Sequence, residues 1–322
     1  MTNRWSTLRI DEASVMHLGV IDTPTLGRHA DALASRRPSP RELFQRWDTQ
    51  QWKIADIELE KDILDFHKRV PKRLREELER LIYTFIIGEY TGTDLLSPVL
   101  LGCPEEWDLL FVTTQASDEA KHTELMFRLG RELLGIDEPP EAMLRSAWEM
   151  TEPAHRRISL IEGEIMGAVT NAPTDYEAWL RGVTLFHMVN EGILALSGQR
   201  LVVNLLGRAG ILPGLRSSFA ALTRDESRHI SYGCHALRLG IKEGHREAIE
   251  DVLEQTIPLA MELANFSDGA GDTLWHLQVK SARRVFTHVG MTDTFTDHIF
   301  NSIINDKKLN KETSRVDRDH PR

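Results

Sequence analysis

The sequence predicts an all-α protein built around a four-helix bundle. Long segments place apolar residues three and four positions apart, which is the spacing of one helical face. Acidic residues fall on these apolar stripes, where an unpaired carboxylate would be costly. Two of the acids are followed three residues later by histidine, so an oxygen and a nitrogen share one face. Together these observations favour a bundle with polar ligands directed into its core.

The first two bundle helices are predicted to begin near Pro71 and Pro104, since proline is favoured in the first turn of a helix. Their inward faces follow from residues spaced three and four apart. These residues are Leu78, Leu81, Ile82, Phe85, Ile86 and Glu89 on the first helix, and Phe111, Gln115, Glu119, His122, Met126 and Leu129 on the second. An acid therefore lies on the apolar stripe of each helix.

The other two bundle helices are separated by a chain break at residues 211–214, whose sequence is Ile-Leu-Pro-Gly. A capping box over Thr174–Glu177 is expected to start the earlier helix. The inward residues are Leu180, Val183, His187, Glu191, Leu194, Ala195 and Gly198 before the break, and Leu215, Phe219, Leu222, Glu226, His229, Gly233 and Leu237 after it. We also expect an accessory helix over 153–170 and outer helices over 247–263 and 292–304, the first of these kinked at Pro258.

Three regions are predicted along the chain. Residues 1–40 carry mixed charge and the run Ser-Arg-Arg-Pro-Ser-Pro at 35–40, which indicates an extended arm. Residues 41–305 form the helical domain, and the polar residues 306–322 form a mobile tail. The length alone would allow two domains, but the helical pattern favours one large bundle.

The composition is typical of a soluble globular protein, with 41% hydrophobic and 27% charged residues. The formal net charge of −10 disfavours a general nucleic-acid-binding surface. No apolar run reaches the roughly 18 residues of a membrane helix, and the N-terminus lacks the apolar core of a signal peptide. Only Cys103 and Cys234 could form a disulfide, so we expect a reducing cytoplasmic location.

Two Glu-x-x-His pairs and two single glutamates form a candidate metal-ligand set. One single glutamate from each of two helices and one pair from each of two others is the ligand set of ferritin-like dimetal carboxylate bundles. The six residues are Glu89, Glu119, His122, Glu191, Glu226 and His229. The sequence therefore predicts a ferritin-like four-helix core with accessory helices.

The Glu-x-x-His motif needs support from its context, because about one match is expected by chance in a chain of this composition. A third match, Glu152 with His155, spans Pro153 at an expected helix start and is interpreted as accidental. The two matches in the bundle are each preceded by an aspartate, at Asp118 and Asp225. Their near identity indicates two halves built on one plan.

Four carboxylates and two divalent cations balance in charge, whereas either set alone would be costly to bury. Mixed oxygen and nitrogen ligands without thiolate suit iron and manganese, so we expect two metal ions, Mn/Fe or Fe/Fe. Asp118 and Asp225 are expected to accept the free N–H of the histidine on the opposite helix, pairing Asp118 with His229 and Asp225 with His122. His187 has no counterpart in the other half and is expected to be a hydrogen-bonded core histidine.

Several stretches, including positions outside the ligands, resemble the ligand-binding oxidases related to the ribonucleotide reductase small subunit. The matching stretches are residues 52–57, 85–89, 118–123, 191–198, 211–214 and 225–233. The resemblance implies a homodimer, a Mn/Fe or di-iron cofactor that activates molecular oxygen, and a long-chain fatty acid in a channel near the metals. It also matches Trp52 to a tryptophan that connects through an aspartate, here Asp225, to a metal-bound histidine, here His122.

Two positions depart from that family, whose members join a valine on the first bundle helix to a tyrosine on the third as an ether cross-link. This chain has Gly92 at the valine position and Phe186 at the tyrosine position, so this pair cannot form the bond. We interpret the missing side chain at Gly92 as room for a ligand beside the metals, and we expect oxidation of a bound apolar molecule. Close helix packing at Gly92 is the alternative explanation.

Two further functions are compatible with the ligand set. A ribonucleotide reductase small subunit would need a metal-centred radical, because Met126 occupies the usual position of the radical tyrosine and no tyrosine follows Tyr232. A non-catalytic metal-storage or ligand-binding protein is the other, although storage bundles are usually shorter. Aromatic N-oxygenation is disfavoured, since Leu222 stands near the position of the additional histidine ligand expected for it.

Overall fold

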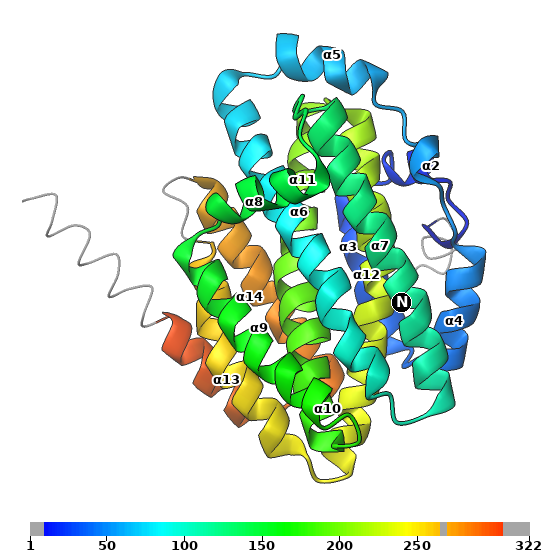
Figure 1. Cartoon of the computed structure of the whole chain (residues 1–322), viewed down its shortest axis with the longest axis vertical. Coiled ribbons are helices and arrows are strands. Elements are labelled where there is room, and N and C mark those ends of the chain that lie inside the picture. The colour runs from blue at the N-terminus through cyan, green and yellow to red at the C-terminus, as the bar shows by residue number, and fades with distance from the viewer. Residues whose placement is uncertain (1–9, 265–268, 305–322) are drawn as a thin grey trace, which may run out of the picture.

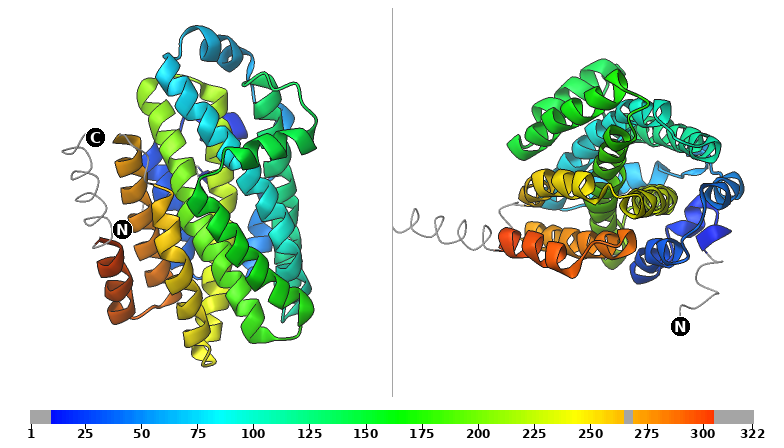
Figure 2. Two further views of the ribbon diagram at one scale, coloured as in Figure 1. Left: turned by 60° about the vertical axis from the view of Figure 1, so that its left-hand side comes forward. Right: turned by 90° about the horizontal axis from the view of Figure 1, so that it is seen from below.

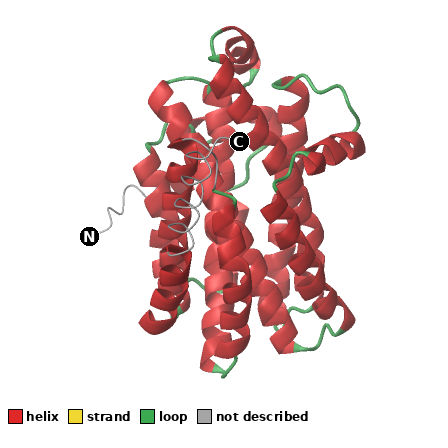
Figure 3. Cartoon of the chain, turned by 90° about the vertical axis from the view of Figure 1, so that its left-hand side faces the viewer, coloured by secondary structure: helices red, strands yellow, loops and turns green. Residues whose placement is uncertain are grey.

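The all-helical prediction is confirmed. A computed structural model of the 322-residue chain describes residues 10–264 and 269–304. In that part of the chain the regular structure is helical and no strand occurs (Figure 3). None of the described helices combines the length and apolar character that a membrane span requires. The predicted tail, residues 306–322, lies outside the described residues.

Four long rods form the core of the molecule (Figure 1). Their elements are α6 (Lys72–Leu101), α7 (Glu106–Glu132), α10 (Tyr176–Val183), η2 (Thr184–Ala195), α11 (Leu196–Ala209) and α12 (Pro213–Lys242). α6 and α7 pack against each other and form the first pair of rods. The third rod is continuous but changes type, because η2 is a π-helix between α10 and α11, and it packs against α12. The predicted four-helix core is therefore present, and its π-helical segment has no counterpart in the prediction.

Shorter helices cover the outside of this core (Figure 2). They are α2 (Val15–Leu18), α3 (Thr23–Ser35), α4 (Pro40–Thr49), the 3-10 helix η1 (Ile54–Asp56), α5 (Glu60–Lys68), α8 (Pro140–Glu149), α9 (Pro153–Asn171), α13 (Arg246–Glu262), α14 (Gly269–Val289) and a helix over residues 293–304. The predicted accessory and outer helices correspond to α9, α13 and the last helix, whereas α14 is additional. Pro258 lies inside α13, and the kink expected there stays a prediction.

The chain break predicted at residues 211–214 falls between α11 and α12, although Gly214 itself lies inside α12. Gly210 adopts a left-handed φ of 64° after α11, and Pro213 is the first residue of α12. The start of α10 differs from the predicted capping box at Thr174. Its N-cap is Asp175, whose carboxylate accepts two backbone N–H groups of the first turn, at 3.0 and 3.1 Å. A carboxylate at this end also complements the helix dipole.

The described part of the segment expected to be an extended arm, residues 10–40, contains the helices α2 and α3. α2 and α3 pack against α12. The buried guanidinium of Arg224 on α12 donates to the backbone carbonyl oxygens of Ala13 and Gln50, at 2.9 and 2.8 Å. The expectation of an extended chain is therefore wrong for α2 and α3. The prediction fails because Arg224, which anchors this segment, lies on α12, far along the sequence. The local composition of the segment gives no sign of that contact.

The bundle has two apolar layers with a polar belt between them. One layer contains Phe85 and Phe219, whose rings meet edge to face at 4.9 Å. The other contains Phe111 and Tyr232, with ring centroids 4.8 Å apart. On α12, Glu226 falls between Phe219 and Tyr232, and the other bundle rods repeat this order. The predicted ligands are therefore shielded from water along the bundle axis on both sides.

The fourth rod approaches η2 closely at Gly233. A Cβ atom at this position would lie 2.3 Å from the Cβ of His187 and 2.8 Å from the terminal methyl of Met188. Both neighbours are fully buried, so neither can move without disturbing the core. The absence of a side chain at Gly233 is what allows this contact.

We expect Gly233→Ala to lower the free energy of unfolding by about 1–3 kcal/mol, because overpacking forces shifts in a close-packed core. Gly163→Ala on α9 is the matched control, since a Cβ there meets no atom within 4 Å. Alanine should stabilise that helix by up to about 1 kcal/mol. Urea denaturation followed by circular dichroism measures both variants, and equal midpoints would contradict the close approach.

Candidate metal centre

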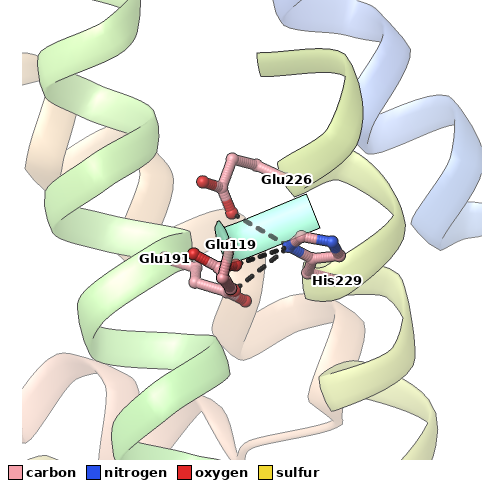
Figure 4. A group of neighbouring side chains, drawn as sticks. All are labelled: Glu119, Glu191, Glu226 and His229. Atoms are coloured by element: carbon pink, nitrogen blue, oxygen red, sulfur yellow. Dashed lines mark hydrogen bonds and ion pairs between the residues drawn. The ribbon is translucent and has the colours of Figure 1, made fainter. Parts of the chain in front are cut away.

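Six side chains from the four rods meet in the polar belt. Their ligand atoms form two groups, and within each group all the atoms lie within 4.8 Å of one another. One group contains Glu119, Glu191, Glu226 and His229 (Figure 4), and the other contains Glu89, Glu119 and His122. Glu119 belongs to both groups. It is therefore placed to contact both ions of a dimetal centre.

Both histidines face the carboxylates through Nδ1. This atom of His229 lies 3.2 Å from Glu191 Oε1 and 3.4 Å from Glu226 Oε2 (Figure 4). In the other group, Nδ1 of His122 lies 3.4 Å from Glu89 Oε2. When the ring proton sits on Nε2, the Nδ1 lone pair is free for a metal ion.

The six side chains fit a pair of metal ions because their polar atoms are buried and unsatisfied. Both histidines are 0% exposed, and the four glutamates are between 1% and 5% exposed. Each glutamate has one buried oxygen without a hydrogen-bond partner, as does Nδ1 of His122. Buried polar atoms in folded proteins nearly always have a partner. Two cations held by this oxygen-rich shell would satisfy them, and such a shell suits iron or manganese.

Burial and the closeness of the acids to one another shift the pKa values of the glutamates and the histidines. Burial and neighbouring carboxylates raise the pKa of Glu89 to about 7, and they raise that of Glu191 well above its usual range. Burial disfavours a charge on His122 and His229, but hydrogen bonds and charges from the surrounding acids hold the pKa of both rings well above the usual value. Protons therefore compensate the carboxylates in the metal-free protein. Metal binding would release them.

An aspartate contacts each histidine on the side away from the glutamates. Nε2 of His122 lies 3.3 Å from Asp225 Oδ2, and Nε2 of His229 lies 3.3 Å from Asp118 Oδ2. Each aspartate comes from the opposite helix, which is the pairing expected from the sequence. By accepting the Nε2 proton, the aspartates leave Nδ1 directed toward the glutamates.

Arg228 joins the two aspartates. Its Nη2 donates to Asp118 Oδ2 at 2.7 Å and to Asp225 Oδ1 at 2.8 Å, while its Nη1 donates to Gln50 Oε1 at 2.6 Å. Burial alone would raise the pKa of Asp225, but Arg228 and His122 hold it well below its usual range. Both aspartates therefore remain acceptors for the histidines.

A tryptophan donates to each aspartate from the N-terminal part of the chain. Nε1 of Trp52 lies 2.7 Å from Asp225 Oδ2, the contact that the family resemblance implies. Nε1 of Trp47 lies 3.1 Å from Asp118 Oδ1. Trp47 and Arg228 are not among the predicted site residues. Arg228 has a recognisable signal, because it lies three residues after Asp225 on the same helical face, but nothing local marks Trp47.

Gln115 connects the centre to His187. Its Nε2 donates to Glu191 Oε1 at 2.8 Å, and its Oε1 lies 3.0 Å from His187 Nε2. Burial lowers the pKa of His187 to about 3, so this ring is neutral. His187 thus lies in the core with a hydrogen-bond partner and belongs to neither group of ligand atoms.

A cavity of about 180 Å³ opens beside the glutamates, with walls from α6, α9, η2 and α14. Gly92 and Phe186 both line it. A Cβ atom at Gly92 would lie 3.1 Å from Glu119 Oε2 and 4.0 Å from Phe186 Cζ, so the two positions face each other at the edge of the centre. Glu152 and His155, the third Glu-x-x-His match, also line the cavity but belong to neither ligand group.

The fold and this site define a class of protein, a helical bundle with a buried dimetal-carboxylate ligand set. Residues 35–266 match the family model described as the ribonucleotide reductase small chain. The match spans more than half of the sequence, and the chain belongs to this family.

Solved structures share the fold. A variant of an R2-like ligand-binding oxidase with an anaerobically reconstituted Mn/Fe cofactor aligns with a TM-score of 0.70 and 24% identity, covering 79% of this chain and 94% of that chain. Another variant, with a non-activated Mn/Mn cofactor, aligns with a TM-score of 0.69 and 23% identity, covering 78% of this chain and 93% of that chain. These similarities confirm the ferritin-like arrangement of the bundle.

We expect Arg228→Met to destabilise the protein by about 3–5 kcal/mol, because it leaves two buried aspartates without their shared cation. Arg131→Met is the matched control, since Arg131 pairs with Glu124 at the surface, where both side chains are about half exposed. Loss of such a pair costs at most about 1 kcal/mol. Guanidinium denaturation compares the variants, and a loss no larger than the control's would argue against the bridging role.

In the metal-free protein, the candidate ligands should contribute less to stability as the pH rises from about 5 to 8. The folded-state pKa of Glu89 is about 7 against an ordinary value of 4.5, so the folded state retains a proton that the unfolded chain loses within this window. The raised pKa values of His122 and His229 act in the same direction at higher pH. Bound Mn(II) requires deprotonated ligands, so the rise in melting temperature on adding it should grow with pH. A rise that stays constant from pH 5 to 8 would contradict the assignment.

Proposed function

We propose that this protein is an oxygen-activating dimetal oxidase or oxygenase with a Mn/Fe or di-iron centre that acts on a largely apolar ligand. The observation that carries the proposal is the continuity between the centre and the cavity. Glu89, Glu119, Glu191 and Glu226 form part of the cavity wall. A molecule in the cavity would therefore lie beside the ions held by these side chains.

The cavity suits an elongated ligand. Its lining on α6 extends from Gly92 back to Arg80, about 18 Å at 1.5 Å per residue. Phe85, Phe186 and Leu194 supply apolar wall along this length. Each methylene group removed from water there contributes about 0.8 kcal/mol to binding. A long-chain fatty acid is the ligand that the family resemblance implies, and it remains our starting candidate for the apolar body.

Oxidation would be directed at the ligand rather than at the protein. Gly92 has no side chain and Phe186 has no phenol oxygen, so the ether bond expected in the resembling oxidases cannot form between them. The two positions nevertheless face each other beside Glu119. The space that a valine would fill at position 92 is therefore open to a bound molecule.

Bound redox-active ions would supply the oxygen chemistry, and the residues around them would hold their ligands in place. Asp118 and Asp225 fix the orientation of the histidines, and Arg228 keeps both aspartates ionised. The hydrogen-bonded series Trp52, Asp225 and His122 provides a continuous connection from the N-terminal segment to the centre. Phe186 restricts the access of water from the cavity side.

Family membership makes a reductase small subunit the second candidate. It would need a metal-centred radical, because Met126 is a fully buried methionine at the position of the usual radical tyrosine. The absence of a tyrosine after Tyr232 also disfavours a radical relay through the C-terminal segment. A non-catalytic metal-binding or ligand-binding bundle is the third candidate. We further propose a homodimer and a cytoplasmic location.

Loading the protein anaerobically with Mn(II) and Fe(II), then admitting oxygen, tests the proposed function. We expect two metal ions per chain and oxygen uptake that produces an oxidised ligand, detected by mass spectrometry in a screen of acyl and amine compounds. Glu191→Ala should reduce the metal content, while Glu164→Ala, on the exposed face of α9, should not. Oxygen uptake that stops after one equivalent, with no altered compound in the screen, would contradict oxygenase function.

A further inference from the structure

One part of the cavity wall is polar and lies outside the metal-ligand set. Glu162 on α9, Asn190 on η2 and Gln278 on α14 all line the cavity. Glu162 and Gln278 are 5% and 1% exposed. None of the three belongs to either group of metal-ligating atoms. The fold thus brings three helices together to place polar side chains beside an otherwise apolar ligand site.

Glu162 accepts hydrogen bonds from Asn190 and Ser159, whereas two amide oxygens of this wall lack a donor. Asn190 Nδ2 donates to Glu162 Oε1 at 2.8 Å, which fixes the orientation of the amide. Asn190 Oδ1 is consequently an acceptor, and it is buried without a hydrogen-bond partner. Gln278 Oε1 is also buried without a partner. Leaving such acceptors unsatisfied costs roughly 1–3 kcal/mol each, which a donor on a bound ligand would recover.

The charge of the lining points to the same kind of ligand. Among the lining residues, all within the described part of the chain, Arg80 is the one lysine or arginine. It is exposed and lies about 14 Å from Glu89 along α6, at 1.5 Å per residue. Burial lowers the pKa of His155, so this ring adds no charge at neutral pH. A carboxylate beside Glu162 would therefore meet a second acid and the amide oxygen of Asn190.

We infer that the cavity binds a primary amine, with the amino group at Glu162 and Asn190 and the apolar body along α6 and η2. An ammonium group has three N–H donors and no acceptor, which suits a buried carboxylate and an unpartnered amide oxygen. The ion pair with Glu162 would also remove the cost of burying that acid alone. This inference rests on the proposed function: it keeps the apolar chain of the fatty acid considered there and replaces the carboxylate head group with an amino group.

Calorimetric titration of the Mn(II)-loaded protein without oxygen tests the inference, with octylamine, octan-1-ol and octanoate as probes. We expect Glu162→Gln to weaken octylamine binding at least about tenfold and not to weaken octanoate binding, because only the amine loses a charged partner. Glu164→Gln is the matched control: it makes the same change on the same helix but on its exposed face. It should leave all affinities within about twofold.

A second variant keeps the test decisive if Glu162→Gln does not fold. Asn190→Leu approximately preserves the size of the side chain and removes its acceptor, and it should weaken octylamine severalfold more than octan-1-ol. The inference is overturned if both variants bind octylamine as well as the unaltered protein does, or if only octanoate binds. Metal content and oxygen uptake are measured separately, so failure of the dimetal function is distinguishable from failure of amine recognition.

Discussion

The burial of four carboxylates at one level of an apolar bundle is the constraint on which the rest of this structure depends. Neighbouring acids repel one another, and the low dielectric constant of the interior strengthens that repulsion. The protein offsets it with two histidines inside the glutamate set and with Arg228 outside it. The apolar layers above and below separate the belt from solvent along the bundle axis, and the cavity lined by Gly92 and Phe186 reaches the glutamates from the side.

The meeting of these six side chains in the core could be predicted from the sequence because each lies in phase with an apolar stripe of its own helix. The cross-pairing of Asp118 and Asp225 also follows, since the two halves repeat one local pattern. The π-helical character of η2 could not be predicted in this way. A helical period of 3.6 residues already places Glu191 on the inward face. The apolar stripe therefore does not reveal that η2 has the backbone hydrogen bonds of a π-helix rather than those of an α-helix. The cap of α10 was misplaced by one residue because Thr174 and Asp175 are both good capping residues.

The N-terminal segment shows where local patterns stop being informative. The composition of residues 1–40 favours an extended arm, yet α2 and α3 pack against α12. The residues that follow supply Trp47, Gln50 and Trp52 to the hydrogen-bond network around the aspartates. These contacts join residues more than seventy positions apart, and their partners are recognisable only once the bundle is assembled. Buried arginines on α12 make the connection, because a guanidinium can satisfy several distant carbonyl and side-chain oxygens at once. The outer helices are therefore part of the centre's support rather than a separate covering.

The π-helical segment places Asn190, on the cavity wall, directly before Glu191, in the ligand set. A backbone shift that moves Asn190 would also move Glu191, because the two residues are adjacent on the same continuous rod. Thermodynamic linkage then makes the relation reciprocal. If a ligand in the cavity changes the affinity of the centre for its ions by some factor, bound ions change the affinity of the cavity for the ligand by the same factor. If both sites are occupied as proposed, η2 would join metal loading and ligand capture in one heterotropic system.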